Sequence, residues 1–298
     1  MPTIDQHLRA VARSRPGIPY WVLEKDYALG YLLAGMAQVP VLHRALVLKG
    51  GTALRKFYFA GYRFSEDLDF SAVVTPPDVD AAMQEAVVAT EAQLQEEGPF
   101  SVTLQRLTLR DRHPGGQDAF TVLVGFPTHR EPLCRLKVEI THDEEVLLPP
   151  VRHSLLHPYP NPPQVAWHCY PLEEIVAEKL RALLQSQVRL RERGWGASRV
   201  CRDVYDLWYV LRHATFDVTL LPKLLERKCA VRQVTYATSA DFLTPALQNI
   251  ARSEWERQLR PFVPDAPSAD QILNELSDRL IALRLHSEET KGDEYAHD

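Results

Sequence analysis

The chain has 298 residues, of which 45% are hydrophobic, and a formal net charge of −5. This length and apolar content are enough for a sizeable core and predict two lobes rather than one. The longest apolar run, residues 27–42, is interrupted by Gln38 and Pro40 and is too short to cross a bilayer, which excludes a membrane-spanning protein.

The start of the chain and the cysteines narrow the class further. Residues 1–6 have no basic cap followed by an apolar stretch, so we expect no secretory signal and a cytoplasmic protein. The cysteines are far apart and form no Cys-x-x-Cys pair, which argues against a zinc site and a disulfide framework. They are Cys134, Cys169, Cys201 and Cys229.

Helices and strands alternate in the first half of the chain, as judged from hydrophobic periodicity and from the Gly and Pro residues between the elements. This mixture predicts an α+β fold with a mixed sheet flanked by helices. The predicted helices are residues 19–38, 78–97 and a segment beginning at 54–58, and the predicted strands are residues 45–48, 64–74, 100–110, 119–126 and 133–142.

The second half of the chain has a different pattern. Residues 149–164 are rich in proline and show no periodicity, so we predict a linker there. It would separate a catalytic lobe, residues 1–148, from a mainly helical lobe, residues 165–298. The last residues of that lobe form an acidic tail, which we expect to be disordered.

A glycine pair follows the first predicted strand, in the sequence Lys49-Gly50-Gly51-Thr52. Glycines expose backbone N–H groups, and the threonine adds a hydroxyl, so the segment is suited to holding a phosphate. A turn with no ligand is the alternative for the glycine pair alone. We predict that Gly50, Gly51 and Thr52 bind phosphate groups, those of a nucleotide under the family resemblance given below, and that Lys49 neutralises their charge.

Acidic residues follow on the next predicted strand. Asp67 and Asp69 are two residues apart, so their side chains lie on the same face, and Ser65 precedes them. We predict that the two aspartates bind Mg²⁺ or Mn²⁺ and that Ser65 bonds a phosphate or a ligand carboxylate. Glu139, on the polar face of a later strand, is the candidate third carboxylate; an exposed glutamate paired with a basic residue is the alternative.

Two charged residues fall within the apolar arcs of predicted helices in the second lobe. On helical wheels Lys179 lies among leucines, with Glu174 and Arg181 outside the arc, and Asp203 lies in the apolar arc of residues 200–211, with Asp206 outside. An unpaired charge there would cost several kcal/mol. Either Lys179 and Asp203 form a structural ion pair, or both face a cleft between the lobes and act on phosphates.

Basic residues concentrate in the same lobe. Residues 179–260 contain 15 Lys or Arg against 8 Asp or Glu, and the densest part surrounds Trp195. Arginines beside an aromatic residue are suited to phosphate and base contacts, while a solvated junction between helices is the alternative. The candidate RNA-binding residues are Arg189, Arg191, Arg193, Arg199 and Arg202.

The order of these motifs resembles a known family. The glycine pair with Thr52, followed by Arg-x-Ser-x-Asp-x-Asp-Phe at residues 63–70, resembles the polymerase-β-like nucleotidyltransferase superfamily. The longer motif, Lys-Gly-Gly-Thr-Ala-Leu at residues 49–54 together with residues 63–70, is similar to the AbiEii/AbiGii toxin branch of that superfamily, which includes the MenT-like toxins. Residues 24–27, Glu-Lys-Asp-Tyr, residues 178–180, Glu-Lys-Leu, and residues 202–207, Arg-Asp-x-x-Asp-Leu, extend the resemblance, which ends near residue 211.

The resemblance implies a function and two further site residues. It implies a polymerase-β-like core and an EC 2.7.7-type enzyme, a toxin usually paired with an antitoxin, which moves a nucleotide from an NTP to an RNA acceptor such as the tRNA 3′ end. It also favours a catalytic role for Lys179 and Asp203, together with Asp67. Transfer to a small molecule or a protein, and a non-catalytic nucleotide-binding module, are the alternatives.

Overall fold

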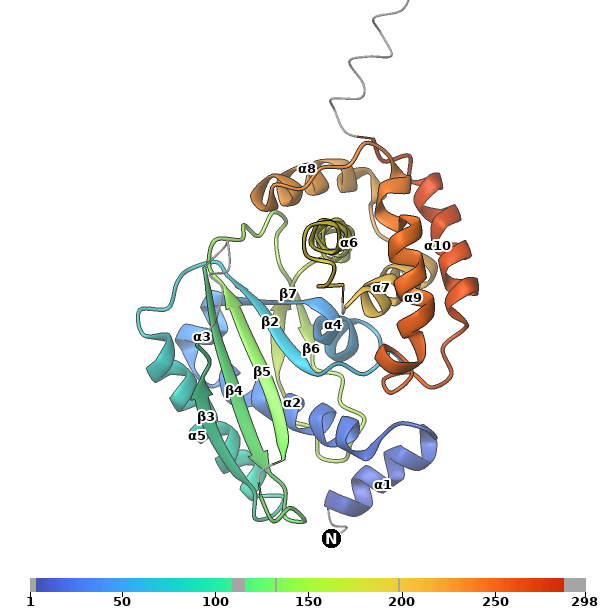
Figure 1. Ribbon diagram of the computed structural model, residues 1–298. Helices are drawn as coiled ribbons and strands as arrows, with labels where there is room; N and C mark the ends of the chain where they lie inside the picture. The colour runs from blue at the N-terminus through green and yellow to red at the C-terminus, as the bar shows by residue number, and fades with distance from the viewer. Residues whose placement is uncertain (1–3, 109–115, 132, 198, 287–298) are drawn as a thin grey trace, which may run out of the picture. The chain divides into compact units, whose positions relative to one another are not determined.

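A computed structural model of the protein describes residues 4–108, 116–131, 133–197 and 199–286 (Figure 1). The chain divides into two compact units, Met1–Tyr170 and Pro171–Asp298. The first unit is built around a mixed sheet with helices and the second is helical, so the predicted α+β fold class is confirmed. The acidic tail predicted to be disordered, residues 288–298, lies outside the described residues.

The first unit contains a seven-stranded sheet with the order β3-β4-β5-β2-β1-β7-β6 (Figure 1). β2 pairs in parallel with β5 and β1 in parallel with β7, whereas the other neighbours are antiparallel. The strands are β1 (Leu46–Lys49), β2 (Asp67–Ala72), β3 (Ser101–Arg106), β4 (Gln117–Gly125), β5 (Cys134–Thr141), β6 (Val151–Ser154) and β7 (Ala166–Cys169).

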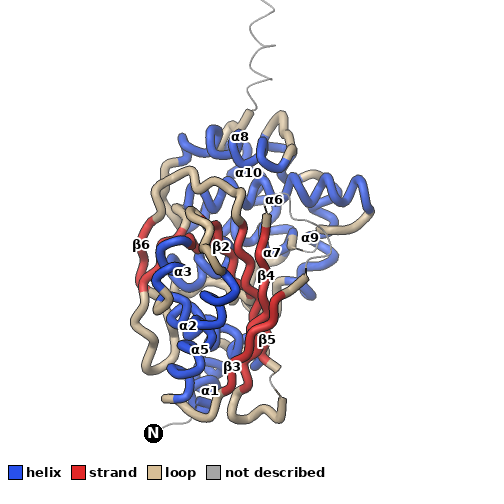
Figure 2. Tube along the Cα trace, turned by 90° about the vertical axis from the view of Figure 1, so that its left-hand side faces the viewer, coloured by secondary structure: helices blue, strands red, loops and turns tan. Residues whose placement is uncertain are grey.

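Helices pack against this sheet and against one another. α2 contacts both α5 and β5, and α5 contacts β3, so these helices lie beside the strands in Figure 2. The helices of this unit are α1 (Ile4–Ser14), α2 (Tyr20–Ala37), α3 (Pro40–Ala45), α4 (Gly50–Ala53) and α5 (Val79–Gln95), and a π-helical turn, Leu54–Tyr58, continues α4. The long predicted helices and the five predicted strands are therefore present, with shifts of a few residues at their ends.

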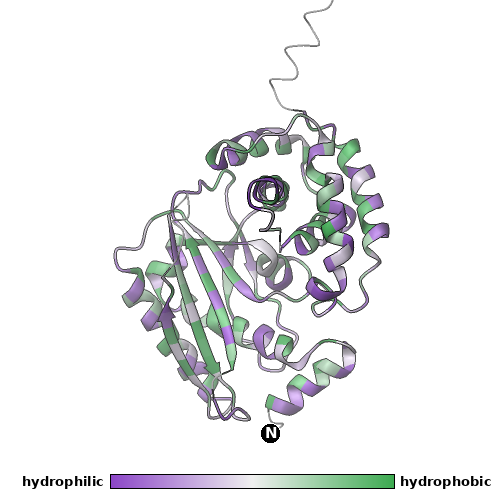
Figure 3. Ribbon diagram, viewed as in Figure 1, coloured by the Kyte–Doolittle hydropathy of each residue, from purple (hydrophilic) through white to green (hydrophobic). Residues whose placement is uncertain are grey.

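Alternation along β2 and β5 gives the sheet one apolar and one polar face at its centre, and Figure 3 shows both residue types along these strands. Leu68 and Phe70 are fully buried, and the Phe70 ring lies 5.3 Å from that of Trp167. The Trp167 indole in turn donates to the Leu33 carbonyl of α2 at 3.1 Å. The apolar side chains thus face α2, and Asp67 and Asp69 face the other side because strand side chains alternate.

The proline-rich segment differs from the predicted linker. It contains β6, which pairs with β7, and β7 in turn lies beside β1 with Leu48 opposite Cys169. The Tyr170 amide also donates to the Leu48 carbonyl at 2.9 Å. The two strands extend the sheet by long-range pairing, which local proline content does not reveal. The boundary between the units therefore lies after Tyr170 rather than at residues 149–164.

The second unit is a group of helices in which α6 contacts both α7 and α8 (Figure 1). Its first helix, α6, ends at Gly194, which has the positive φ angle of 71° typical of a glycine helix end. The helices are α6 (Leu172–Arg193), α7 (Val200–His213), α8 (Leu221–Arg232), α9 (Pro245–Gln258) and α10 (Ala269–Ala282), with short 3₁₀ turns at Val218–Leu220 and Ser239–Leu243.

Packing on two sides of α6 corrects the helical-wheel analysis. Glu174 and Arg181, expected outside the apolar arc, are both buried. Glu174 Oε1 lies 2.7 Å from the buried Lys228 Nζ of α8, and Glu178 Oε1 lies 3.4 Å from the same atom. The wheel assigns one buried arc to a helix, whereas α6 buries a second face against α8 through ion pairs.

Among the described residues, no helix is long and apolar enough to cross a membrane.

A buried histidine gives the first testable prediction. The His157 ring lies 4.9 Å from the Tyr159 ring and 5.6 Å from the Tyr27 ring, and burial lowers its pKa from 6.5 to about 3. The unfolded chain thus binds a proton on His157 below about pH 6.5, whereas the folded protein binds it only near pH 3. As the pH falls through that window, the free energy of unfolding should therefore decrease by up to about 1.4 kcal/mol per pH unit.

His157→Phe keeps an aromatic ring at this position and removes the titration. We expect the pH dependence of urea unfolding between about pH 6 and 4 to flatten by roughly one proton, while His168→Gln, at an exposed site, leaves it as in the wild type. Equal slopes for the wild type and His157→Phe would show that another group causes the loss.

Candidate functional site

The glycine pair lies directly against the predicted metal ligands. Gly50 has a φ angle of 74°, which favours glycine, and a Cβ atom there would lie 2.9 Å from Asp69 Oδ2. A Cβ atom at Gly51 would lie 2.6 Å from Arg63 Nη2 and 3.1 Å from Ser65 Oγ. The structure therefore brings Gly50 to Asp69 and Gly51 to Ser65, and larger residues at either glycine would clash.

The glycines form the start of a helix rather than a loop before it. α4 begins at Gly50, and the π-helical turn follows it without a break. The buried Thr52 hydroxyl donates to the main-chain carbonyl of Asp67. The hydroxyl predicted to bind phosphate thus ties α4 to β2 in this structure, and it sets the distance between the glycine pair and the carboxylates.

Asp67, Asp69 and Glu139 lie on one face of the sheet. Asp69 is opposite Glu139 in the parallel β2–β5 pair, and Asp67 is opposite Lys137, so these four side chains point to the same side. We call this group of Asp67, Asp69, Lys137 and Glu139 the carboxylate face. The parallel pairing of two strands far apart in sequence brings the predicted third carboxylate next to the first two.

The contacts of Glu139 include one side chain from β4 and one from β5. Gln117 Nε2 donates to Glu139 Oε1 at 2.8 Å, and Lys137 Nζ lies 2.9 Å from the same oxygen. Among the described residues, no three His, Cys, Asp or Glu side chains are arranged as a ready-made metal site. The three carboxylates supply oxygen ligands on one face, which is the donor type that Mg²⁺ and Mn²⁺ prefer. Glu139 would have to exchange Lys137 for the cation to join them.

Lys49 has a partner that sequence analysis missed. Its ammonium group lies 3.0 Å from Glu144 Oε2, both side chains are buried, and it also lies 5.6 Å from the centre of the Tyr170 ring. No motif in the sequence marks Glu144 as this partner, and the glutamate is only 4% exposed. Lys49 therefore neutralises Glu144 in this structure, and its predicted role at a phosphate would require it to leave that carboxylate.

The start of α2 is tied to the segments on both sides of the site. Lys25 Nζ lies 2.9 Å from Glu66 Oε1, in the residue before Asp67. Asp26 Oδ1 lies 2.8 Å from Lys56 Nζ and 3.3 Å from Arg55 Nε, both in the π-helical turn that continues α4. These contacts explain why the Glu-Lys-Asp-Tyr sequence accompanies the glycine pair: it holds the glycine helix and β2 in place.

Asp26 stays ionised inside the first unit. Burial raises its pKa, but the charges and hydrogen bonds of Lys56 and Arg55 outweigh burial and hold the pKa well below its usual range. Arg55 also donates to the carbonyls of Ala60 and Tyr62, at 3.1 and 2.9 Å. The resulting network fixes the connection between α4 and β2.

In the second unit, Lys179 contacts two carboxylates. Its Nζ lies 2.6 Å from Asp203 Oδ1 and 2.9 Å from Asp206 Oδ2. Both aspartates are buried, although the wheel placed Asp206 outside the apolar arc. Residues 203 and 206 are three apart on α7, so their side chains are neighbours on the helix surface, a spacing that could have identified the second partner. The cluster carries a net charge of −1.

The predicted RNA-binding arginines divide into two groups. Arg202 packs on the Phe262 ring at 4.2 Å and donates to the Gln258 carbonyl at 3.4 Å, which makes it a structural residue. The guanidinium of Arg193 lies 5.8 Å from the Trp195 ring, and that ring is 66% exposed. The arginines that are exposed are Arg189, Arg191, Arg193 and Arg199.

The comparison with protein families decides the class of the chain. The model of the AbiEii family, nucleotidyltransferase toxins of type IV toxin–antitoxin systems, matches residues 31–275. The chain belongs to the AbiEii nucleotidyltransferase family. It matches no curated protein. The family match covers the glycine pair, the carboxylate face and the Lys179 cluster, and it shows an EC 2.7.7-type enzyme that uses an NTP.

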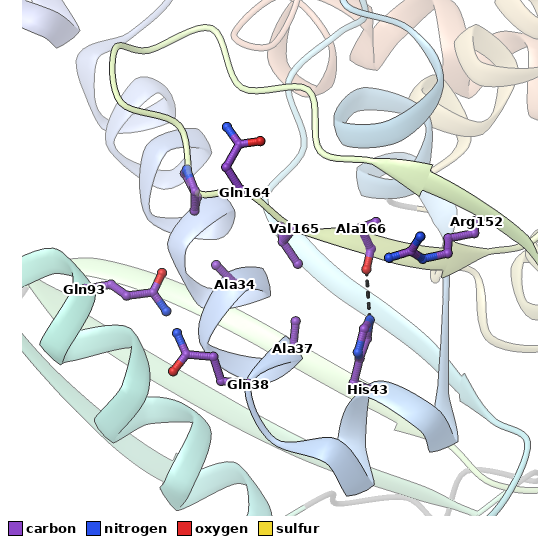
Figure 4. A pocket seen from close by; sticks show the side chains of 10 residues that line it. Ala34, Ala37, Gln38, His43, Gln93, Arg152, Gln164, Val165 and Ala166 are labelled. Atoms are coloured by element: carbon purple, nitrogen blue, oxygen red, sulfur yellow. Dashed lines mark hydrogen bonds between the residues drawn. The ribbon is translucent and has the colours of Figure 1, made fainter.

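One pocket of this AbiEii-family enzyme lies away from the predicted site. It has a volume of about 490 Å³ and is lined from α2, α5 and the β6–β7 edge, as Figure 4 shows. The His43 Nε2 atom donates to the Ala166 carbonyl at 2.9 Å across it. No predicted site residue lines this pocket. Its polar lining comes from Gln38, His43, Gln93, Arg152 and Gln164.

Proposed function

We propose that the protein transfers a nucleoside monophosphate from an NTP to an RNA acceptor, the 3′ end of a tRNA, as the toxin of a toxin–antitoxin pair. The observation that supports this most strongly is the contact between the glycine pair and the carboxylate face. Gly50 and Gly51 form the first turn of α4, where backbone N–H groups have no partner within the helix, and Asp69 lies against Gly50. Phosphates held at the glycines would therefore lie beside the carboxylates that act on them.

The glycine pair and its neighbours would bind the triphosphate. Gly50 and Gly51 hold the triphosphate through the backbone, and Ser65 adds a hydroxyl beside Gly51. Thr52 contributes its main-chain N–H, while its hydroxyl anchors Asp67. These groups place the α-phosphorus for in-line attack by the acceptor hydroxyl, with pyrophosphate as the leaving group.

The carboxylate face would hold a divalent cation through Asp67, Asp69 and Glu139. When bound, Mg²⁺ or Mn²⁺ supplies Lewis-acid stabilisation of the phosphates and lowers the pKa of the acceptor hydroxyl. Gln117 keeps the Glu139 carboxylate in position by donating to Oε1.

Lys179 and Asp203 complete the proposal. We assign Lys179 to the charge that develops on pyrophosphate and Asp203 to its orientation, since the lysine is held at 2.6 Å by Asp203 and remains 16% exposed. Asp206 is fully buried and also contacts Lys179, and we assign it a structural role.

The direct test uses the purified protein. We expect one labelled NTP, incubated with Mg²⁺ and total RNA, to label a tRNA-sized band. Label on a small molecule or on protein would support the alternative acceptors. Absence of transfer to any acceptor from all four NTPs would support a non-catalytic nucleotide-binding module instead.

The exposed arginines give a second prediction. If Arg191 and Arg193 contact the phosphates of the acceptor, Arg191→Glu with Arg193→Glu should weaken RNA binding. It should also reduce the slope of log affinity against log salt by roughly 0.7 per lost contact. NTP binding should not change.

The matched control reverses two exposed charges on α8, Lys223→Glu with Arg227→Glu, and changes the net charge by the same amount. We expect a smaller loss of RNA affinity and the wild-type salt slope. Fluorescence anisotropy over a range of salt concentrations measures both variants. Equal slopes for the two double variants would contradict an RNA surface at Arg191 and Arg193.

A further inference from the structure

The carboxylate face has an electrostatic requirement that its acidic residues cannot meet. Asp67, Asp69 and Glu139 place three negative charges where the proposed substrate brings a polyanionic triphosphate. A bound divalent cation offsets only part of this charge. Nucleotide binding there therefore needs a cationic side chain that reaches the phosphates from the same face.

Two predicted lysines have other places in the fold or in the proposal. Lys49 is buried and lies 3.0 Å from Glu144. Lys179, which lies between Asp203 and Asp206, is assigned above to the charge that develops on pyrophosphate during transfer, so the triphosphate still needs a cationic partner before transfer. Lys137 differs from Lys49 because its side chain is 35% exposed. It is also opposite Asp67 in the β2–β5 register, so its stem begins about 5 Å from that strand.

We propose that Lys137 binds the triphosphate of the NTP substrate and competes with the divalent cation for Glu139. Lys137 Nζ lies 2.9 Å from Glu139 Oε1. The ammonium group can exchange this carboxylate for a phosphate by rotation of its flexible stem. Glu139 keeps a partner after this exchange, because Gln117 Nε2 donates to the same oxygen at 2.8 Å.

This exchange links the two ligands of the site. As long as Lys137 holds Glu139, it neutralises a carboxylate that would otherwise bind the cation. Once the triphosphate attracts Lys137, the carboxylate becomes available, so nucleotide and cation should favour each other's binding. Lys137 is thus a substrate-binding residue that also regulates metal affinity. The inference rests on the proposed function, since it requires the NTP to bind at the carboxylate face.

The test measures two affinities in Lys137→Met, which keeps the length of the side chain and removes its charge. We expect the dissociation constants of ATP, CTP, GTP and UTP, measured by calorimetry with Mg²⁺, to rise roughly tenfold to a hundredfold for whichever the wild type binds. Binding of the corresponding nucleoside should not change. Affinity for Mn²⁺ alone, measured by electron paramagnetic resonance, should instead increase about threefold or more.

Two controls separate this role from a structural one. Arg135→Met removes an exposed charge two residues away on the same strand face, and we expect wild-type affinities for NTP and Mn²⁺. Lys137→Arg keeps the charge and should retain most NTP affinity. Wild-type NTP affinity in Lys137→Met would overturn the inference and leave the proposed function intact. Failure of the wild type to bind any NTP would overturn both.

Discussion

Asp67→Asn should reduce nucleotide transfer by at least about 1,000-fold and leave the melting temperature within a few degrees. The substitution removes one of the proposed metal ligands on the carboxylate face, and loss of the divalent cation would cost several kcal/mol of transition-state stabilisation. The fold should tolerate it because the contact from the Thr52 hydroxyl goes to the main-chain carbonyl of Asp67 rather than to its carboxylate.

Transfer assays and thermal unfolding on the same preparations measure both effects. Asp143→Asn is the matched control: it makes the same change at an exposed aspartate just past the end of β5 and should retain wild-type transfer. Glu139→Gln should reduce activity less than Asp67→Asn does. Gln117 and Lys137 already contact the Glu139 carboxylate, so it contributes less of its charge to a bound cation. Undiminished transfer by Asp67→Asn would exclude Asp67 from the site.

The Lys179 cluster offers a second large effect, because its three charges respond unequally to substitution. Lys179→Met leaves Asp203 and Asp206 buried together without their cation and should destabilise the protein by roughly 3 to 5 kcal/mol. Asp203→Asn instead leaves a balanced pair of Lys179 and Asp206. We expect its free energy of unfolding to stay within about 1 kcal/mol of the wild type.

Asp203→Asn is therefore the variant that tests chemistry without loss of the fold. If Asp203 orients Lys179 for transfer, this variant should lose at least about a hundredfold in rate while it binds NTP. Asp206→Asn makes the same charge change around the same lysine and should retain most transfer. Urea unfolding and single-turnover transfer distinguish the outcomes, and full transfer by Asp203→Asn would identify the cluster as a structural ion pair.

Much of the first unit could be predicted from the sequence because its signals are local. Alternation places Asp67 and Asp69 on one side of β2 and the fully buried Leu68 and Phe70 on the other. The positive φ angle of Gly50 is likewise a local property, because it favours glycine at that one residue. The order of these motifs likewise indicates the nucleotidyltransferase family, which the match over residues 31–275 confirms.

Other charged side chains have partners that only the tertiary structure decided. Glu144 neutralises Lys49, and Glu174 pairs with Lys228 of α8. Local periodicity describes one face of one element, whereas an ion pair depends on which second element packs against it. For the same reason a proline-rich segment could become β6, since the pairing that stabilises a strand comes from its neighbour rather than from its own composition.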